Sequence, residues 1–362
     1  MARSNSFLLA LAGAALVASS GAGARAEDDL GRVLRVIGQS SAGAPIPGRF
    51  VIDARLKPGD APFQSTVEGW FAALPPDTGT GEIEGSCVES RCALSVDLDD
   101  GKLGLTGDLG GPATPGPGRA SLKAEDDKTP HQGAVTYALV SGPIPDLGEL
   151  APPDAVTAQE MEELLMWNGS QGGFSNVDKD WPDSFERGLL ADWQAGAGRP
   201  ATGLILVADL KEMRAGAMAA KAKADWKVLG DPALGWSGGY PASLLTKASQ
   251  AQGERRFESA DGKAKLVLAV DPPLTSEAFD AFWEKVKARA EAGEGQGYTR
   301  VNSDFEISWR EKDVVVTAVA HSREGGLARL EFSYPADQDE TWAPYKTILP
   351  RSLRVTDALK PK

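Results

Sequence analysis

The sequence predicts a multidomain α+β protein with an N-terminal β-sandwich or barrel, a central three-helix module and a C-terminal antiparallel sheet covered by helices. The first observation is the length of 362 residues, which exceeds what one hydrophobic core usually holds. The second is a change of period, because apolar residues alternate near both ends of the chain but recur every three or four positions in its middle. The third is a pair of joints rich in proline and glycine, at 110–118 and 142–153.

Residues 1–26 are expected to form a signal peptide. Arg3 supplies a positive start, residues 7–17 form an apolar run too short to span a bilayer, and Ala24-Arg25-Ala26 offers a cleavage site. We therefore expect cleavage after Ala26 and a periplasmic or secreted protein with no integral membrane segment. An uncleaved membrane anchor is the alternative, although no stop-transfer pattern follows the run.

Residues 27–150 are predicted to form the β-rich domain. Cys92, Leu94 and Val96 alternate with polar residues as in a half-buried strand, and Asp99-Asp100-Gly101 can turn the chain into a returning strand. We expect Cys87 and Cys92 to form a disulfide, because an exported protein meets an oxidising environment. A redox-active pair is the alternative, but the spacing is not Cys-x-x-Cys.

Residues 151–225 are predicted to form the helical module. Thr157 and Glu160 can form a capping box at the start of the first helix. The second helix is expected to end at the glycines that follow Gln194, and Thr202-Gly203 then turns the chain into the third. The apolar stripes of the last two helices consist of Phe185, Leu189, Leu190 and Trp193 and of Leu206, Leu210 and Met213.

The stretch from Ser184 to Arg214 resembles the second half of a peptidoglycan-binding module of the small three-helix type. The shared pattern is a helix, an aromatic residue followed by Gln, small residues, Thr-Gly and a short helix. The resemblance implies a cell-wall location and a non-catalytic role. The family's Asp-Gly-x-x-Gly-x-x-Thr turn is absent, and residues 176–182 stand in its place.

Trp181 is the glycan contact that we expect from this resemblance, because exposed indoles stack on sugar rings and Trp181 precedes Pro182 in an irregular loop. Arg187 and Gln194 are expected to add polar contacts to the glycan. The alternative for Gln194 is that backbone groups satisfy its amide, and Trp193 is expected to fill a core position.

Residues 226–362 are predicted to form the C-terminal sheet. Asp261-Gly262 can turn a hairpin, and a helix is expected from Ser276 to Ala292. Three antiparallel strands follow between 305 and 334, and a last helix carries Trp342 and Leu349. We expect both helices to cover one face of the sheet.

This region resembles a PsbP/Mog1-like α+β domain, in the order of its elements and in three landmarks. The landmarks are Gly239-Tyr240-Pro241-Ala242, Phe257-x-Ser259-x-Asp261-Gly262 and the closing Arg351-Ser352-Leu353-Arg354. Domains of this type are mostly binding or scaffolding units, so the resemblance implies a role other than catalysis.

The balance of 38 basic against 51 acidic side chains, a net charge of −13, excludes a nucleic-acid-binding protein. No pattern indicates an enzyme: we expect no catalytic residue, no cofactor and no metal site, and we interpret His321 at a strand end as a surface or packing residue. The sequence therefore predicts an exported, non-catalytic envelope protein that binds peptidoglycan or a wall-associated partner. The alternative is an accessory factor that binds a protein or a small ligand and whose helical module is only a structural joint.

Overall fold

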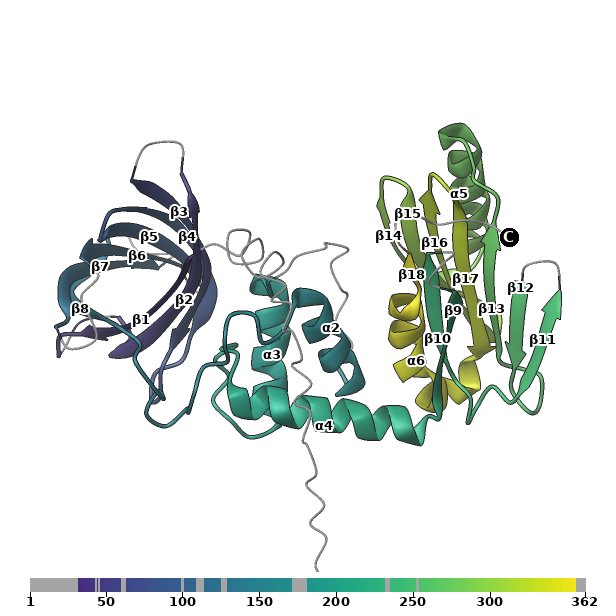
Figure 1. The fold of residues 1–362 in the computed structure, drawn as a ribbon, viewed down its shortest axis with the longest axis horizontal. Coiled ribbons are helices and arrows are strands. Elements are labelled where there is room, and N and C mark those ends of the chain that lie inside the picture. The colour runs from purple at the N-terminus through teal and green to yellow at the C-terminus, as the bar shows by residue number, and fades with distance from the viewer. Residues whose placement is uncertain are drawn as a thin grey trace, which may run out of the picture.

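The computed structural model describes residues 32–42, 44, 46–59, 63–98, 101–108, 114–124, 129–170, 181–231, 235–251 and 254–355 (Figure 1). The predicted signal peptide, Asp99 and Asp100 of the predicted turn, and residues 171–180 lie outside the described residues. Figure 1 shows a barrel at one end, helices in the middle and the C-terminal strands at the other end.

The predicted α+β class is wrong, because the protein is mostly β. Strands make up 48% of the described part of the chain, which contains five α-helices. Several glycines lie within strands, among them Gly69 in β3. A Cβ at Gly69 would come 2.4 Å from the Cα of Ala54 on the neighbouring strand. Such glycines allow close approach inside the sheet and do not end strands.

The first part is a closed antiparallel barrel in which each strand pairs with the next and β8 pairs with β1. Apolar side chains fill its interior, among them Phe50, Ile52, Phe71, Ile83 and Leu103. The eight strands are β1 (Arg32–Ser40), β2 (Arg49–Pro58), β3 (Gln64–Ala73), β4 (Thr80–Val88), β5 (Arg91–Leu98), β6 (Gly101–Asp108), β7 (Gly116–Ala124) and β8 (His131–Leu139).

The predicted disulfide between Cys87 and Cys92 is confirmed. The two residues are directly opposite each other on β4 and β5, with their Cα atoms 4.1 Å apart, and both belong to the barrel core. The disulfide therefore links two residues that the pairing of β4 with β5 already places opposite each other.

Three helices follow the barrel: α2 (Ala158–Trp167), α3 (Ser184–Gly196) and α4 (Val207–Lys223). Thr157 caps α2 by accepting a hydrogen bond from the backbone N–H of Glu160. Gly198 has a φ of 71° just beyond α3, a conformation that glycine adopts without a steric penalty. The helices enclose a common apolar core that includes Met161, Leu165, Leu190 and Met213.

A second apolar cluster joins this module to the outer face of the barrel. Val51, Trp70 and Ala72 point outward from β2 and β3 and pack against Leu204 and Leu206, which precede α4. The segment between β8 and α2 adds Ile144 and Leu150 to the same cluster. The barrel thus has one interior core and one patch on its outside that the helical module covers.

The C-terminal part contains two antiparallel sheets. The smaller has the order β18-β10-β9 and the larger the order β11-β12-β13-β17-β16-β15-β14. Their strands are β9 (Trp226–Asp231), β10 (Trp236–Pro241), β11 (Lys247–Ala251), β12 (Glu254–Glu258), β13 (Lys265–Asp271), β14 (Glu294–Val301), β15 (Asp304–Glu311), β16 (Val314–Arg323), β17 (Gly326–Pro335) and β18 (Arg354–Val355).

The two helices of this part, α5 (Ser276–Glu291) and α6 (Asp339–Ser352), cover opposite faces of the larger sheet, so the expectation that they share a face is wrong. On β16, Val316 and Ala318 pack with α5, whereas Val319 packs with α6. Successive side chains of a strand point to opposite faces, and β16 is apolar on both. Its continuous apolar run is typical of a strand covered on two sides.

Candidate functional site

The structure places all three predicted glycan contacts inside the protein. Trp181 is 6% exposed, and Arg187 and Gln194 are each 1% exposed. The indole of Trp181 lies between two guanidinium groups, with Cζ of Arg55 on β2 5.5 Å and Cζ of Arg187 on α3 5.3 Å from the ring centroid. The expectation that Trp181 lies on the surface is therefore wrong, because the barrel covers it.

Arg187 connects α3 to the barrel. Its Nη2 donates to Oδ2 of Asp53 on β2 at 2.8 Å, and its Nε donates to the carbonyl oxygen of Pro182 at 3.2 Å. Asp53 is fully buried and also accepts from Nε of Arg35 at 2.9 Å. Trp70 adds a bond from its Nε1 to the carbonyl oxygen of Thr202 at 2.7 Å. We call this set of contacts the barrel joint.

Gln194 holds the turn that precedes α4. Its Nε2 donates to the carbonyl oxygen of Leu204 at 3.1 Å and to Oδ2 of Asp209 at 2.7 Å. Its Oε1 accepts from the backbone N–H groups of Thr202 at 3.0 Å and Gly203 at 2.9 Å. These bonds use both donors and both lone-pair directions of the amide. The structure therefore supports the alternative for Gln194, in which groups of the protein satisfy its amide.

Trp193 and Leu189 are only partly buried, whereas a core position was expected for both. Both side chains line a groove of 460 Å³ between the ends of α2, α3 and α4. The guanidinium of Arg199 lies 5.3 Å from the Trp193 ring centroid and forms ion pairs with Asp209 and Glu212. Trp193 therefore packs at the edge of the helical core, whereas Trp181 is the more deeply buried of the two tryptophans.

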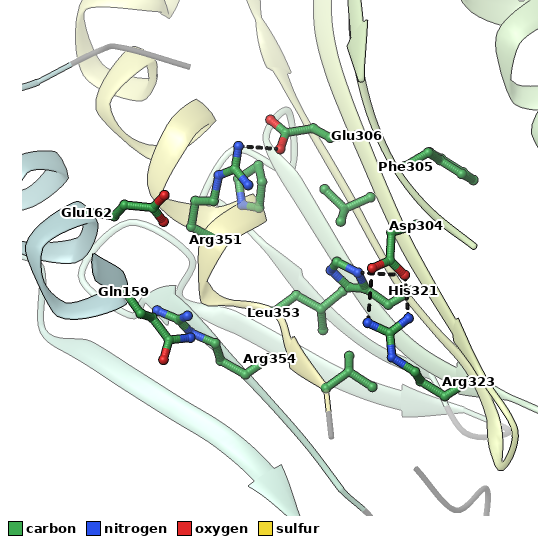
Figure 2. A pocket seen from close by; sticks show the side chains of 13 residues that line it. Gln159, Glu162, Asp304, Phe305, Glu306, His321, Arg323, Arg351, Leu353 and Arg354 are labelled. Carbon is green, nitrogen blue, oxygen red and sulfur yellow. Dashed lines mark hydrogen bonds and ion pairs between the residues drawn. The ribbon is translucent and has the colours of Figure 1, made fainter. Parts of the chain in front are cut away.

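A second site lies where α2 meets the C-terminal part, in a cavity of 160 Å³ that we call the junction pocket (Figure 2). The walls come from α2, β15, β16, α6 and β18. Apolar atoms of Phe305, Val319 and Leu353 form part of the lining. Most of the other lining residues are ionisable: Glu162, Asp304, Glu306, His321, Arg323, Arg351 and Arg354.

One side of the junction pocket consists of ionisable side chains on the paired strands β15 and β16. Asp304 accepts from Nη1 of Arg323 at 2.5 Å and from Nη2 at 3.0 Å. Nδ1 of His321 lies 3.3 Å from Oδ1 of Asp304, an ion-pair distance without the alignment of a hydrogen bond. Burial alone would raise the pKa of Asp304, but the interactions with His321 and Arg323 outweigh it and lower this pKa to about 2. Arg323 and Asp304 therefore balance each other.

The other side has longer ion pairs. Nη2 of Arg351 lies 3.4 Å from Oε2 of Glu306, and Nη2 of Arg354 lies 3.8 Å from Oε2 of Glu163. Glu163 has a shorter partner in Nζ of Lys221, at 2.5 Å from its other oxygen.

Two carboxyls of the junction pocket have a raised pKa. Burial raises the pKa of Glu306, against the opposing charges of Arg351, His321 and Lys346. Burial also raises the pKa of Glu162 on α2, against Arg351 and Arg354. An arginine side chain keeps its charge at any ordinary pH, so a fall in pH makes the junction pocket more positive.

This arrangement offers charged and polar side chains that can bind a polar group. Among the described lining residues there is no serine, threonine, cysteine or lysine to act as a nucleophile. No group of three or more His, Cys, Asp or Glu side chains in the described ranges could hold a metal ion. Likewise, none of the described helices is both long and apolar enough to cross a bilayer.

Sequence reasoning missed most of the junction pocket. Arg351 and Arg354 stood in one landmark of the PsbP/Mog1-like resemblance, but nothing assigned them a ligand. Glu162 and Glu306 are two acids among many, and only the packing of α2 against α6 and the sheet brings them together. The sequence distinguishes these two acids only by their positions, because each lies within an element that is otherwise amphipathic.

No protein-family model matches the sequence, and no curated protein sequence matches it. Among solved structures, the chain is similar to the solution structure of cyanobacterial PsbP (CyanoP) from Synechocystis sp. PCC 6803, at 11% identity and a TM-score of 0.27, covering 36% of this chain and 92% of that chain. A likeness with so low a TM-score carries no argument about the fold or the function of this chain, and none of the comparisons supports a peptidoglycan-binding module.

Proposed function

We propose that the protein is a non-catalytic binding factor whose helical module is a structural joint and whose ligand site is the junction pocket. One observation carries the proposal: the pocket is assembled from both sides of a junction. Gln159 and Glu162 come from α2, whereas Arg351, Arg354 and Glu306 come from the C-terminal part. A ligand in such a cavity contacts both parts and favours the arrangement in which they touch.

The role of the helical module as a joint is supported by its contacts at both ends. At one end, Arg187 reaches the buried carboxylate of Asp53 on the barrel. At the other end, the ring of Trp167 on α2 meets that of Trp226 on β9 edge to face, with centroids 5.0 Å apart, and Ile348 of α6 enters the core of the helices.

The proposal is tested by thermal unfolding of the wild-type protein and of Arg351→Gln in a panel of small anions, cations and neutral polar molecules. We expect at least one compound to raise the Tm of the wild type and to lose this effect in Arg351→Gln. Glu162→Gln should change the response to the same compound, because the two side chains face each other across the junction (Figure 2).

Arg256→Gln is the matched control, since Arg256 lies on β12 and does not line the junction pocket. It should respond to the panel as the wild type does. If no compound distinguishes Arg351→Gln from the other two proteins, the junction pocket is not a ligand site and the proposal is rejected.

One observation favours a second candidate function, the binding of cell-wall glycan. Its site would be the groove beside Trp193, whereas the sequence suggested Trp181. Trp193 lines a groove together with the carboxylates of Asp192 and Glu212, and sugar sites commonly combine an aromatic face with such acceptors. Sedimentation with purified sacculi tests it: Trp193→Ala should remain in the supernatant, whereas Met218→Ala, altered at a 72% exposed side chain of α4, should pellet with the wild type. A wild-type protein that does not pellet rules out this candidate. The export that this function requires stays a prediction from residues 1–26.

A further inference from the structure

We propose that Asn168 is a site of spontaneous deamidation, and that the loss of its amide nitrogen releases a hydrogen-bonded contact between α2 and α4. Asn168 and Gly169 form an Asn–Gly sequence directly after α2. The reaction needs no enzyme and no ligand, so the inference is independent of the proposed function. Its basis is this sequence, the hydrogen bonds of the Asn168 amide and the space that the amide occupies against α4.

The Asn–Gly sequence favours attack of a backbone nitrogen on the side-chain amide. The nitrogen of Gly169 forms a bond with Cγ of Asn168, and Nδ2 leaves as ammonia to give a cyclic succinimide. Water opens this ring at either carbonyl and leaves aspartate or isoaspartate, so a water is consumed and an ammonia is released. Glycine has no Cβ to hinder the attack, and Gly169 is exposed, so water reaches the ring.

The amide of Asn168 connects α2 to α4. Its Nδ2 donates to the carbonyl oxygen of Leu164 at 2.7 Å and to that of Met213 at 2.9 Å. Both partners are acceptors, so the NH2 group and not Oδ1 must face them. Leu164 belongs to α2, and Met213 lies within α4, 45 positions beyond Asn168. We call these two bonds the helix clamp.

Gly216 provides the space in which the helix clamp forms. A Cβ at Gly216 would come 2.2 Å from Oδ1 of Asn168 and 3.2 Å from its Cγ. Gly216 lies inside α4, where alanine would be the better helix former. The side chain of Asn168 that packs against this position explains why a glycine occupies it.

The helix clamp slows the reaction that removes it. Attack requires that Nδ2 of Asn168 leaves both carbonyl oxygens. It also requires that the N–H of Gly169 gives up its bond to the carbonyl oxygen of Met166, at 3.1 Å. Each hydrogen bond favours the closed arrangement by roughly fivefold, so the three bonds together slow deamidation by about a hundredfold.

Deamidation removes the donor on which the helix clamp depends. An aspartate side chain has no N–H, so its oxygens would face the carbonyl oxygens of Leu164 and Met213 without a proton between them. Isoaspartate also adds a methylene group to the backbone after α2. Asn168 and Gly169 line the groove beside Trp193, and the new carboxylate therefore adds a negative charge to that groove.

The test is peptide mapping by mass spectrometry after incubation at mildly alkaline pH, which measures the rate of deamidation at Asn168. We expect this rate to be about a hundredfold lower in the folded protein than in denaturing urea. Gly216→Ala should raise the rate in the folded protein about tenfold or more, because the new Cβ displaces the amide from its acceptors. Gly188→Ala is the matched control: Gly188 lies in α3, a Cβ there meets nothing within 4 Å, and the rate should equal that of the wild type.

Asn168→Asp tests the release of the helix clamp separately from the reaction. Hydrogen exchange across α4 should be about tenfold faster in this variant than in the wild type. Asn302→Asp is its control, since Asn302 lies in the exposed turn between β14 and β15 and gains the same charge there. Exchange across α4 in this control should equal that of the wild type.

Three results would overturn the proposal. An absence of deamidation at Asn168 in urea excludes the modification site. Equal rates in the folded protein and in urea, or a wild-type rate in Gly216→Ala, exclude protection by the helix clamp. Unchanged exchange across α4 in Asn168→Asp excludes its release. Circular dichroism establishes that each variant is folded, and the comparison of folded protein with urea needs no variant if Gly216→Ala is not.

Discussion

Removal of the Arg187 guanidinium should loosen the attachment of α3 to the barrel, and Arg187→Met does so while it keeps the aliphatic stem. The guanidinium contributes a charge-assisted bond to the buried Asp53, a bond to the carbonyl oxygen of Pro182, and a contact with the face of Trp181. Breaking a buried ion pair typically costs about 3–5 kcal/mol, because the remaining charge loses its partner.

For Arg187→Met we expect a loss at the lower end of that range, about 3 kcal/mol. Asp53 keeps a second partner, Nε of Arg35 at 2.9 Å, so its charge is not left uncompensated. Against this, the apolar side chain that replaces the guanidinium cannot satisfy the Pro182 carbonyl oxygen, and an unsatisfied buried acceptor costs about 1–3 kcal/mol.

The assay is urea unfolding followed by tryptophan fluorescence, to which Trp181 at the barrel joint contributes together with the other tryptophans of the chain. Arg214→Met is the matched control: Arg214 forms an ion pair with Glu160 at 2.7 Å, but their side chains are 44% and 41% exposed. An exposed pair of this kind contributes about 0–1 kcal/mol. Equal midpoints for Arg187→Met and Arg214→Met would refute the reasoning, because they would show that the buried pair stabilises no more than a surface pair.

Two further predictions concern the barrel and the start of α3. Cys87 and Cys92 should resist alkylation until a reductant is added, and replacement of both by serine should lower the free energy of unfolding by about 2 kcal/mol, as expected for a short disulfide loop. Burial and the adjacent Asp183 raise the pKa of Glu186 from 4.5 to about 7, so the folded state binds a proton more tightly than the unfolded state. The stability that this proton provides is complete below about pH 4.5, falls as the pH rises to about 7, and amounts to about 3 kcal/mol. Glu186→Gln should flatten that dependence in unfolding curves measured across this range, and a slope as steep as that of the wild type would exclude Glu186 as its source.

The parts of the fold that the sequence predicts well are those that depend on neighbours along the chain. Thr157 begins α2 because its hydroxyl reaches a backbone N–H three residues on, and a glycine follows α3 because the cap requires a positive φ. The disulfide joins residues of one hairpin, so its formation also depends on a local alignment. In each case the residues that determine the feature lie within a few positions of one another.

The misassigned features depend on contacts between distant segments. Trp181 is buried by Arg55, which belongs to a barrel strand more than one hundred positions earlier in the chain. The sides of the sheet occupied by α5 and α6 depend on the register of β15, β16 and β17, and the apolar run of β16 suits a helix on either face. A period of two identifies a strand but cannot determine which partner covers each face.

The same distinction explains why the acidic balance of the chain does not indicate the site. A net charge of −13 describes the surface as a whole, whereas the binding properties argued above depend on a few carboxyls that burial removes from that surface. Asp53 is fully buried and forms ion pairs with Arg35 and Arg187, which belong to the contacts of the barrel joint. Glu306 and Glu162 are buried less completely beside Arg351, and burial raises the pKa of both carboxyls. The charge inside a pocket of this chain therefore depends on which carboxyls are buried and paired there, and the overall charge of the chain does not determine it.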